Sequence, residues 1–393
     1  MKRRVYLDAA STTYVSGEVL QEMLPVFDTF YGNANSLHSF GREAAALLDE
    51  ARDKIAKAIK ANASEIYFTS GGTEANNWAI KGLAYANRKK GNHIITSQIE
   101  HPSVLESCRQ LEQEGFKVTY LPVDKYGIVS LAKLIHYLDN DTILVSIMTA
   151  NNEVGTIQNL NAIAKTVKER GVLFHTDAVQ ATGSISFDVK NLNVDAMTMS
   201  AHKIYGPKGM GALYVKKGVK INNLLQGGSQ EYSKRAGTVN VPAAVGFGKA
   251  MEVAVRDMHA NNQKLKSLRD YFVKELNARI EGVHLNGHPV QRLPHISNFS
   301  FDFIEGESIM LMLDLEGVAV STGSACSSGS LEQSHVLKAM GISHELSNGA
   351  IRFSFNKAVT KEDIDYTIDK LEVIVKKLRA ISPLTKKYKG AKE

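Results

Sequence analysis

Short apolar runs alternate with helical patterns through the middle of the chain. The apolar runs read as strands, at residues 94–97, 117–121, 142–148 and 172–176. A helical pattern at 160–170, ended by a glycine, separates the last two. Continuous apolar strands separated by helices predict a mostly parallel sheet that is covered on both faces. Ligands of such sheets bind at the carboxyl ends of the strands.

The last third of the chain has a different pattern. A helical pattern covers about residues 250–280, and two strand-like segments follow at 296–301 and 351–355. An amphipathic helix is predicted at 361–381, with Thr360 as its N-cap. We therefore predict a second, smaller α+β domain, which the N-terminal segment joins.

This change of pattern sets the predicted domain boundaries. The large α/β domain covers residues 15–258, and the small domain combines residues 1–14 with 259–393. The chain has 393 residues, which is enough for two domains and a large core.

Composition narrows the class of protein. Hydrophobic residues make up 44% of the chain and charged residues 22%, as in ordinary globular proteins. The net charge of +6 is spread out, so direct nucleic-acid binding is not expected. Two cysteines favour a reducing compartment over a disulfide framework. The N-terminus has no apolar signal region, and no apolar run is long enough for a membrane span. These features predict a cytoplasmic protein that does not bind membranes.

Two residues in distinctive settings suggest the chemistry. Lys203 lies among small and polar residues, after a strand pattern and before a Gly-Pro turn, where a Schiff base with an aldehyde cofactor is plausible chemistry. Cys326 lies in a loop of glycine and serine, the setting of a mobile nucleophile. Together they indicate sulfur chemistry on an amino acid.

A phosphate site is predicted where residues 68–77 join an apolar run to a helix. The glycines there, including Gly72, let backbone N–H groups point at an anion, and Thr73 adds a hydroxyl. Ser200 and His202, beside the lysine, are candidates for the same phosphate. The Ser-Gly-Gly-Thr sequence is also a good helix entry, so the motif alone is not specific.

Residues at the ends of other predicted strands are suited to bind a pyridine ring. Asp177 would keep the ring nitrogen protonated, and Gln180 would bond the phenolic oxygen. His101 suits ring stacking and proton relay, and Asn152 suits the ring oxygen or a substrate carboxylate. Helix capping is an equally ordinary role for Asp177 and His101, and a turn for the Asn-Asn pair. Their joint order, ending at Lys203, predicts a pyridoxal 5′-phosphate enzyme.

Six segments carry a family resemblance across nearly the whole chain. They are residues 70–77, 100–101, 151–156, 175–180, 200–203 and 323–327. As a set they resemble NifS/IscS-type cysteine desulfurases. The resemblance implies a fold-type-I pyridoxal-phosphate homodimer, with a mostly parallel seven-stranded sheet in the large domain and a smaller α+β domain. It also implies removal of sulfur from L-cysteine, giving L-alanine and an enzyme persulfide.

The resemblance also assigns roles around the cofactor. It places Lys203 in the Schiff base, Asp177 at the ring nitrogen and His101 on the ring face. Gln180 and Asn152 would contact the ring oxygen and the substrate.

The phosphate and substrate roles follow in the same way. Thr73, Ser200 and His202 would hold the phosphate, and Thr238 would reach the phosphate of the neighbouring subunit. Arg352 would bind the substrate carboxylate with its bidentate fork.

The sulfur-carrying role falls to Cys326. A mobile loop at about 321–333 would carry its persulfide to acceptors, such as an iron–sulfur scaffold protein or a carrier for tRNA thiolation. In complex with a scaffold, Cys326 would also serve as a transient iron–sulfur ligand. Another pyridoxal-phosphate reaction, such as transamination or selenocysteine cleavage, and a sulfur-trafficking role with weak catalysis are the alternatives. A transaminase has no use for this thiol.

The chain departs from the family pattern after the lysine. Serine occupies positions 229 and 233, where the family usually has glycine. If these positions require a positive φ, serine costs energy there, which bears on the segment that carries Thr238.

Overall fold

The computed structural model describes residues 3–322 and 333–383. Its largest sheet has seven strands, and the order across the sheet is β2-β8-β7-β6-β5-β3-β4. Only β8 runs against its neighbours, so the sheet is mostly parallel, as predicted. The strands in this order are Ile66–Thr69, Gly211–Val215, Ala196–Ser200, Leu173–Asp177, Thr142–Ser146, His93–Ser97 and Lys117–Leu121.

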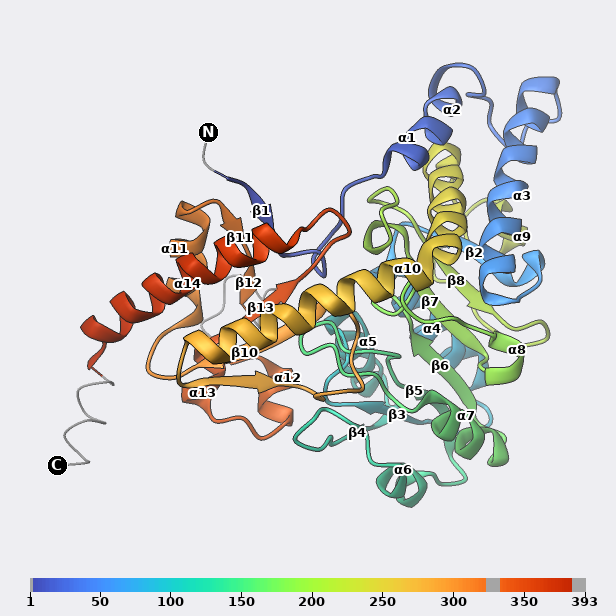
Figure 1. The fold of residues 1–393 in the computed structure, drawn as a ribbon. Coiled ribbons are helices and arrows are strands. Elements are labelled where there is room, and N and C mark those ends of the chain that lie inside the picture. The colour runs from blue at the N-terminus through green and yellow to red at the C-terminus, as the bar shows by residue number, and fades with distance from the viewer. Residues whose placement is uncertain (1–2, 323–332, 384–393) are drawn as a thin grey trace.

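Helices cover both faces of this sheet (Figure 1). Neighbouring residues of one strand point to opposite faces: Ile94 packs with α4 and α5, and Ile95 packs in the cluster that contains α3, α7 and the first half of α10. The helices of this region are α1 (Gly17–Met23), α2 (Pro25–Asp28), α3 (Ser39–Ile59), α4 (Gly72–Asn87), α5 (Pro102–Gln113), α6 (Leu131–Tyr137), α7 (Leu160–Glu169), α8 (Val189–Leu192), α9 (Gln230–Ser233) and α10 (Val241–Arg279), with short 3₁₀ turns η1 (Ala63–Glu65) and η2 (Ala201–Lys203).

A second core forms around a four-stranded sheet with the order β12-β13-β10-β9. The N-terminal strand β1 (Val5–Tyr6) joins this part of the molecule by pairing in parallel with β11 (Val318–Ala319). The remaining elements are β9 (Val283–Asn286), β10 (Ile296–Phe301), β12 (Ser321–Thr322), β13 (Ala350–Ser354), α11 (Gly306–Leu315), α12 (His335–Ala339), α13 (His344–Asn348) and α14 (Lys361–Ile381).

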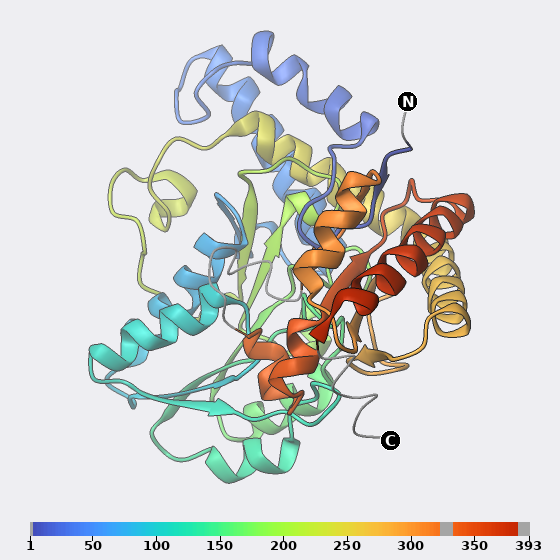
Figure 2. The same ribbon diagram turned by 90° about the vertical axis from the view of Figure 1, so that its left-hand side faces the viewer.

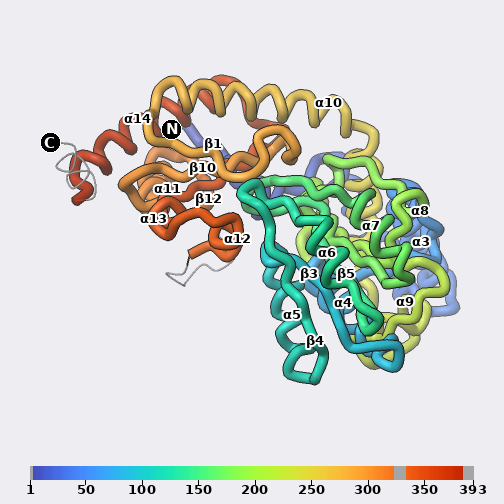
Figure 3. The backbone as a smooth tube through the Cα atoms, turned by 90° about the horizontal axis from the view of Figure 1, so that it is seen from below, coloured from blue at the N-terminus to red at the C-terminus, as the bar shows by residue number. Residues whose placement is uncertain are grey.

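Helix α10 contributes to both cores. Phe247 belongs to the core of the large sheet and Phe272 to the core of the small sheet. Figure 3 shows α10 extending across both parts. The helix begins at Val241, about nine residues before the predicted start, because Asn240 caps it and a proline lies in its first turn. We propose that the boundary between the two predicted domains runs through α10, where residue 258 lies.

The other predicted elements lie close to their predicted positions. Helix α14 has the predicted bounds, and Thr360 forms a capping box with Asp363. Strand β5 ends two residues earlier than predicted, which leaves Met148 in the loop that follows. Within the described ranges, no helix is both long and apolar enough to cross a bilayer.

Candidate active site

A cavity of about 300 Å³ lies at the carboxyl ends of the parallel strands. Strands β6 and β7, the segments that follow them and the loops after β3 and β5 supply most of its wall, because parallel strands end at one edge of the sheet. The cavity brings together the predicted cofactor and substrate residues other than Thr238. They are Gly72, Thr73, His101, Asn152, Asp177, Gln180, Ser200, His202, Lys203 and Arg352.

One end of the cavity is built to receive an anion. Gly71 has φ +155°, a conformation that side chains rarely allow, and α4 begins at the next residue. A Cβ on Gly72 would lie 2.8 Å from Val179 Cγ2, so glycine keeps the backbone close to the cavity wall. Ser200 Oγ is buried and has no hydrogen-bond partner among the described residues. A phosphate at this helix N-terminus would satisfy that hydroxyl.

His202 extends the same end of the cavity. Its Nδ1 lies 3.1 Å from Thr12 Oγ1, and its backbone carbonyl accepts a hydrogen bond from Thr13. Burial and the nearby cations Lys203 and Lys208 lower the pKa of His202 to about 4. The ring is therefore neutral near pH 7 and offers a hydrogen bond rather than a charge.

A buried hydrogen-bond chain joins Asp177 to His101. Asn76 Nδ2 donates to Asp177 Oδ2 at 2.7 Å and to Ser103 Oγ at 2.9 Å. Ser103 Oγ in turn lies 2.8 Å from His101 Nδ1. Asn76 thus orients the carboxylate and the imidazole together. The sequence analysis did not single out Asn76, although it follows Gly72 by one helical turn and so lies on the same face of α4.

His101 both caps helix α5 and lines the cavity. Its Nδ1 accepts the backbone N–H of Ser103 at 3.1 Å, which caps α5. In the neutral ring the proton therefore lies on Nε2. Burial lowers the pKa of His101, Asp177 opposes this shift, and Lys203 and His335 add to it. The lowered pKa favours the neutral ring, which carries its proton on Nε2.

The N-terminal segment forms one wall around Lys203. Lys203 Nζ donates to the carbonyl oxygens of Ala10 and Ser11 at 2.6 and 2.7 Å. Gln180 Nε2 donates to the Ala10 carbonyl at 2.9 Å. These backbone groups carry no signal in the sequence, because their role depends on a contact more than 160 residues away.

Arg352 is almost fully buried beside this wall. One terminal nitrogen donates to the Asn152 carbonyl at 3.0 Å, and the other donates to Asp8 at 2.9 Å and to Ser11 Oγ at 2.7 Å. Within the part of the chain that the structure describes, Arg352 Nε is buried without a partner. The guanidinium is therefore fixed in position and retains a donor for a ligand.

Two buried glutamates lie directly behind the cavity. Glu100 Oε1 accepts from Ser97 Oγ at 2.5 Å and from the Met148 N–H at 3.0 Å, and burial raises its pKa to about 8. Glu153 Oε2 accepts from Ser334 Oγ at 2.6 Å, and burial raises its pKa to about 7. The sequence analysis predicted no role for either carboxyl.

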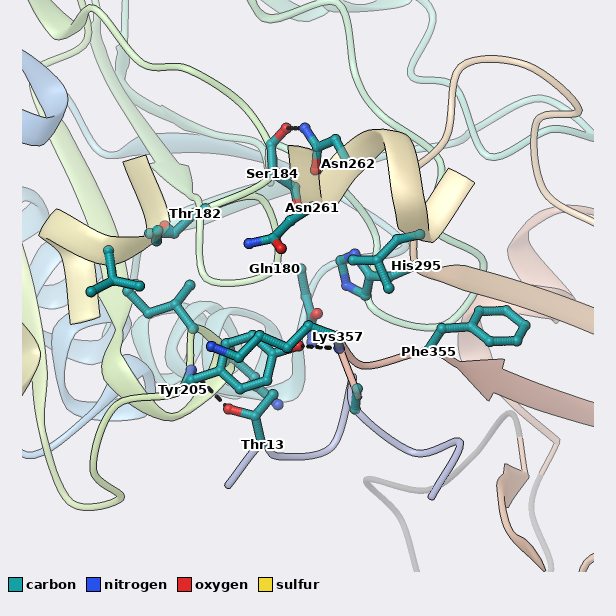
Figure 4. A pocket seen from close by; sticks show the side chains of 17 residues that line it. Thr13, Gln180, Thr182, Ser184, Tyr205, Asn261, Asn262, His295, Phe355 and Lys357 are labelled. Atoms are coloured by element: carbon teal, nitrogen blue, oxygen red, sulfur yellow. Dashed lines mark hydrogen bonds between the residues drawn. The ribbon is translucent and has the colours of Figure 1, made fainter. Parts of the chain in front are cut away.

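A smaller pocket, of about 50 Å³, lies on the other side of Lys203 and Gln180 (Figure 4). Its polar lining includes His295, Asn261 and Lys357. Burial and nearby cations lower the pKa of His295 to about 4. This volume suits a few ordered water molecules rather than a substrate.

Thr238 lies outside both of these pockets. Its side chain is exposed at the end of the segment formed by residues 227–238. Glu231, Tyr232 and Ser233 in this segment all have positive φ, whereas Ser229 has φ −85°. The strain expected from replacing glycine with serine therefore arises at position 233 and not at 229.

Two ion pairs hold the 227–238 segment in place. The fully buried Glu231 pairs with Arg52 at 2.6 Å and accepts the Phe68 N–H at 2.7 Å. Arg235 pairs with Glu74, whose other hydrogen bond reaches the N–H of Ser70. The segment is thus tied to the glycine-rich turn at the anion end of the cavity.

Cys326 lies outside the described residues, as does most of the predicted loop at 321–333. Cys108 is fully buried in α5, and burial raises the pKa of its thiol. Among the described residues there is no group of three or more His, Cys, Asp or Glu side chains that suits a metal ion.

Comparisons with known proteins give a consistent result. The Aminotransferase class-V family matches residues 5–367. Cysteine desulfurase IscS of Dictyoglomus turgidum is 55% identical over 389 residues, 99% of each chain. Cysteine desulfurase IscS of Methanosarcina thermophila is 52% identical over 98% of this chain and 95% of that protein.

Solved structures agree in fold. A NifS-like protein superposes with a TM-score of 0.91 at 42% identity, over 96% of this chain and 100% of that one. A structure described as SspA in complex with cysteine superposes with a TM-score of 0.80 at 35% identity, over 90% and 99%. These matches confirm the predicted family, fold and cofactor class. The chain belongs to the class-V aminotransferase family, within its cysteine desulfurases, and is a pyridoxal 5′-phosphate-dependent enzyme.

Proposed function

We propose that this enzyme removes the sulfur of L-cysteine, leaving L-alanine and a persulfide on Cys326. The observation that carries the proposal is that Lys203, Asp177 and Arg352 meet in one cavity, in a chain 55% identical to a cysteine desulfurase. A solved relative named as a complex with cysteine supports the same substrate.

The cavity suits pyridoxal phosphate at each end. Thr73, Ser200 and His202 surround the anion end, where Ser200 Oγ has no partner within the part of the chain that the structure describes. Asp177 and Lys203 line the same cavity, so they would hold the ring nitrogen and the aldehyde carbon. When bound, the cofactor supplies an electron sink for bond changes at the substrate carbons.

The protein's own groups would orient the substrate and move its protons. Arg352 is fixed by Asp8 and Ser11, so its remaining donors would bind the substrate carboxylate with little loss of entropy. Asn152 and Gln180 would orient the substrate and the ring oxygen. His101 would hold a proton on Nε2 and offer it to the substrate, since its Nδ1 accepts the N–H of Ser103.

Cys326 would complete the reaction as a thiolate. Its sulfur attacks the substrate sulfur, an S–S bond forms and the substrate Cβ–S bond breaks. The electron pair of that bond stays with the substrate, which is protonated and released as L-alanine. The persulfide would then pass to acceptors for iron–sulfur cluster assembly or tRNA thiolation, with Cys326 as a transient cluster ligand on a scaffold.

We also propose that the enzyme acts as a homodimer. Helices α1, α2 and α3 project at one end of the molecule (Figures 1 and 2). Large apolar side chains are exposed there, which favours contact with a second copy. They are Leu20, Leu24, Phe27, Tyr31, Leu37 and Phe40. The exposed Thr238 would then reach the phosphate in the neighbouring subunit.

Product analysis tests the proposed reaction. The purified, cofactor-loaded enzyme is mixed with L-cysteine and a thiol reductant, and alanine and sulfide are both measured. We expect equal amounts, with at least a ~1000-fold loss of rate in Lys203→Ala and Cys326→Ser, since each removes a covalent partner.

The buried Cys108 supplies the matched control. Cys108→Ser should keep most of the activity, and the persulfide should map to Cys326. A keto acid in place of alanine would show transamination instead. Full activity of Cys326→Ser would contradict the proposed acceptor.

A further inference from the structure

The short helix α12 is attached to both loops that carry cavity residues. Ser334 Oγ donates to Glu153 Oε2 at 2.6 Å, and Glu153 follows Asn152. His335 Nε2 lies 2.9 Å from the Glu100 carbonyl oxygen, so it donates to the residue before His101. The first turn of α12 is thus hydrogen-bonded beside two of the cavity's polar side chains.

A small apolar cluster strengthens this attachment. Val336, Leu337 and Met340 pack against side chains of the same two loops, in a cluster separate from the three larger ones. The loop side of this cluster consists of Ile99, Met148 and Val154. Met148 also lines the cavity, so the cluster and the cavity share a wall.

The two loops are themselves held together beneath α12. Asn151 Nδ2 donates to the Ile99 carbonyl at 2.9 Å, and the Met148 N–H donates to Glu100 Oε1 at 3.0 Å. Asn298 donates to the Glu153 carbonyl at 3.2 Å. These hydrogen bonds fix the backbone at Glu153, whose carboxylate accepts the hydrogen bond from Ser334.

The attachment lies close in sequence to the sulfur-accepting residue. Cys326 follows Thr322 by four residues and precedes Ser334 by eight. The described residues at both ends of this stretch, Thr322 and Ser334, are therefore its points of attachment. Thr322 ends β12, whose Ser321 pairs with Arg352, so the segment also starts next to the cavity.

We propose that Glu153 is a positioning residue, which together with Ser334 and His335 sets the reach of Cys326 to the substrate sulfur. The inference rests on the proposed function, because it concerns the sulfur transfer to Cys326. It separates two steps: the transfer depends on Glu153, whereas binding of the amino-acid substrate does not.

The experiment compares variants of the cofactor-loaded, full-length enzyme in a single turnover. Glu153→Met keeps the size and removes the acceptor for Ser334, whereas Glu153→Gln keeps an acceptor oxygen. We expect persulfide on Cys326, measured by alkylation and mass spectrometry, to form roughly tenfold more slowly in Glu153→Met, as for loss of a hydrogen bond to a charged group. Glu153→Gln should recover most of the rate.

Two serines provide a matched control for helix capping. Ser334 and Ser343 each cap a five-residue helix through their hydroxyl, but only Ser334 also bonds Glu153. Ser334→Ala should slow persulfide formation, and Ser343→Ala should not. The dissociation constant of L-alanine, measured from the cofactor spectrum, should stay within about twofold in all variants.

The outcomes are distinguishable. Wild-type rates in Glu153→Met and Ser334→Ala would overturn the positioning role alone, as would an equal loss of L-alanine binding. Absence of persulfide in the wild-type enzyme would overturn the proposed function together with this inference. If Glu153→Met does not fold, the same assay compares His335→Leu with His335→Gln. The glutamine retains a side-chain N–H, so only His335→Leu should slow persulfide formation.

Discussion

The Lys203 cavity and the 227–238 segment hold their polar groups in different ways. In the cavity, Asn76, Ser103 and backbone carbonyls orient the polar side chains through hydrogen bonds within one chain. The segment depends on ion pairs, keeps three successive residues at positive φ and ends in an exposed threonine. Hydrogen bonds among its own residues therefore shape the cavity. Ion pairs, by contrast, hold the segment in a strained backbone conformation in which Thr238 is exposed.

Loss of the buried ion pair between Arg52 and Glu231 should destabilise the 227–238 segment more than any other change considered. Glu231→Ala leaves Arg52 buried without its carboxylate, which should lower the free energy of unfolding by about 3–5 kcal/mol. Urea denaturation of the apoenzyme measures this. The control is the double variant Arg52→Met with Glu231→Leu, which removes both charges and should recover much of the loss. A single variant as stable as wild type would show that the pair does not hold the segment.

On the cavity side, Glu100 gives a pH-dependent test. Its folded pKa of about 8 lies above the ordinary 4.5, so its contribution to stability is complete below pH 4.5 and is lost as the pH rises through 8. Glu100→Gln stays neutral and should be more stable than wild type at pH 9 by roughly 3 kcal/mol, since each pKa unit corresponds to about 1.4 kcal/mol and hydration offsets part of the shift.

Thermal unfolding at pH 4 and pH 9 checks this prediction. The two proteins should agree at the lower pH, where both side chains are neutral. A stability difference that is the same at both pH values would assign it to packing and not to ionisation.

Asn76 tests whether the hydrogen-bond chain orients the cavity groups. Asn76→Ala removes donors to Asp177 and Ser103 and should cost about 1–3 kcal/mol in stability. The absorbance of the bound cofactor should shift, because Asp177 loses the bond that fixes its carboxylate. Asn77→Ala, the neighbouring position with a bond to Thr73 on the same helix, is the control. An unchanged spectrum in Asn76→Ala would contradict this role.

The smallest expected effect relieves strain in the segment. Ser233 has φ +60°, so Ser233→Gly should raise the free energy of unfolding by about 1 kcal/mol. Ser229→Gly is the matched control: its φ of −85° is ordinary, and glycine there should give no gain. Equal effects at both positions would argue against backbone strain as the cause.

Residue patterns predicted most of the fold because its elements are locally encoded. Helix α14 has a clear amphipathic pattern and a capping box, so its bounds were predictable. The start of α10 was missed because Asn240 and the proline that follows define it, ahead of the clearer pattern at 250. Continuous apolar runs predicted four strands of the large sheet, β3, β4, β5 and β6, whereas the number of seven strands came from the family resemblance.

The candidate site was predictable only in part. Polar residues at strand ends identified Asp177 and Lys203, because topology brings strand ends together. Asn76 and the carbonyls of Ala10 and Ser11 were missed, since their roles arise from contacts between distant segments. The buried Glu153 had no predicted role, because its contact with Ser334 joins segments 181 residues apart.

The wall around Lys203 joins two segments that lie 344 residues apart and are therefore synthesised at different times. Ala10 and Ser11 contact Lys203, and their place is fixed by Arg352 and Ser354 of β13. At about 5–20 residues per second, the ribosome makes Ser354 roughly 17–70 s after Ala10. The contacts of the N-terminal segment with β13 therefore form only after β13 has been synthesised. A nascent chain truncated before β13 lacks the contacts that fix the wall beside the lysine.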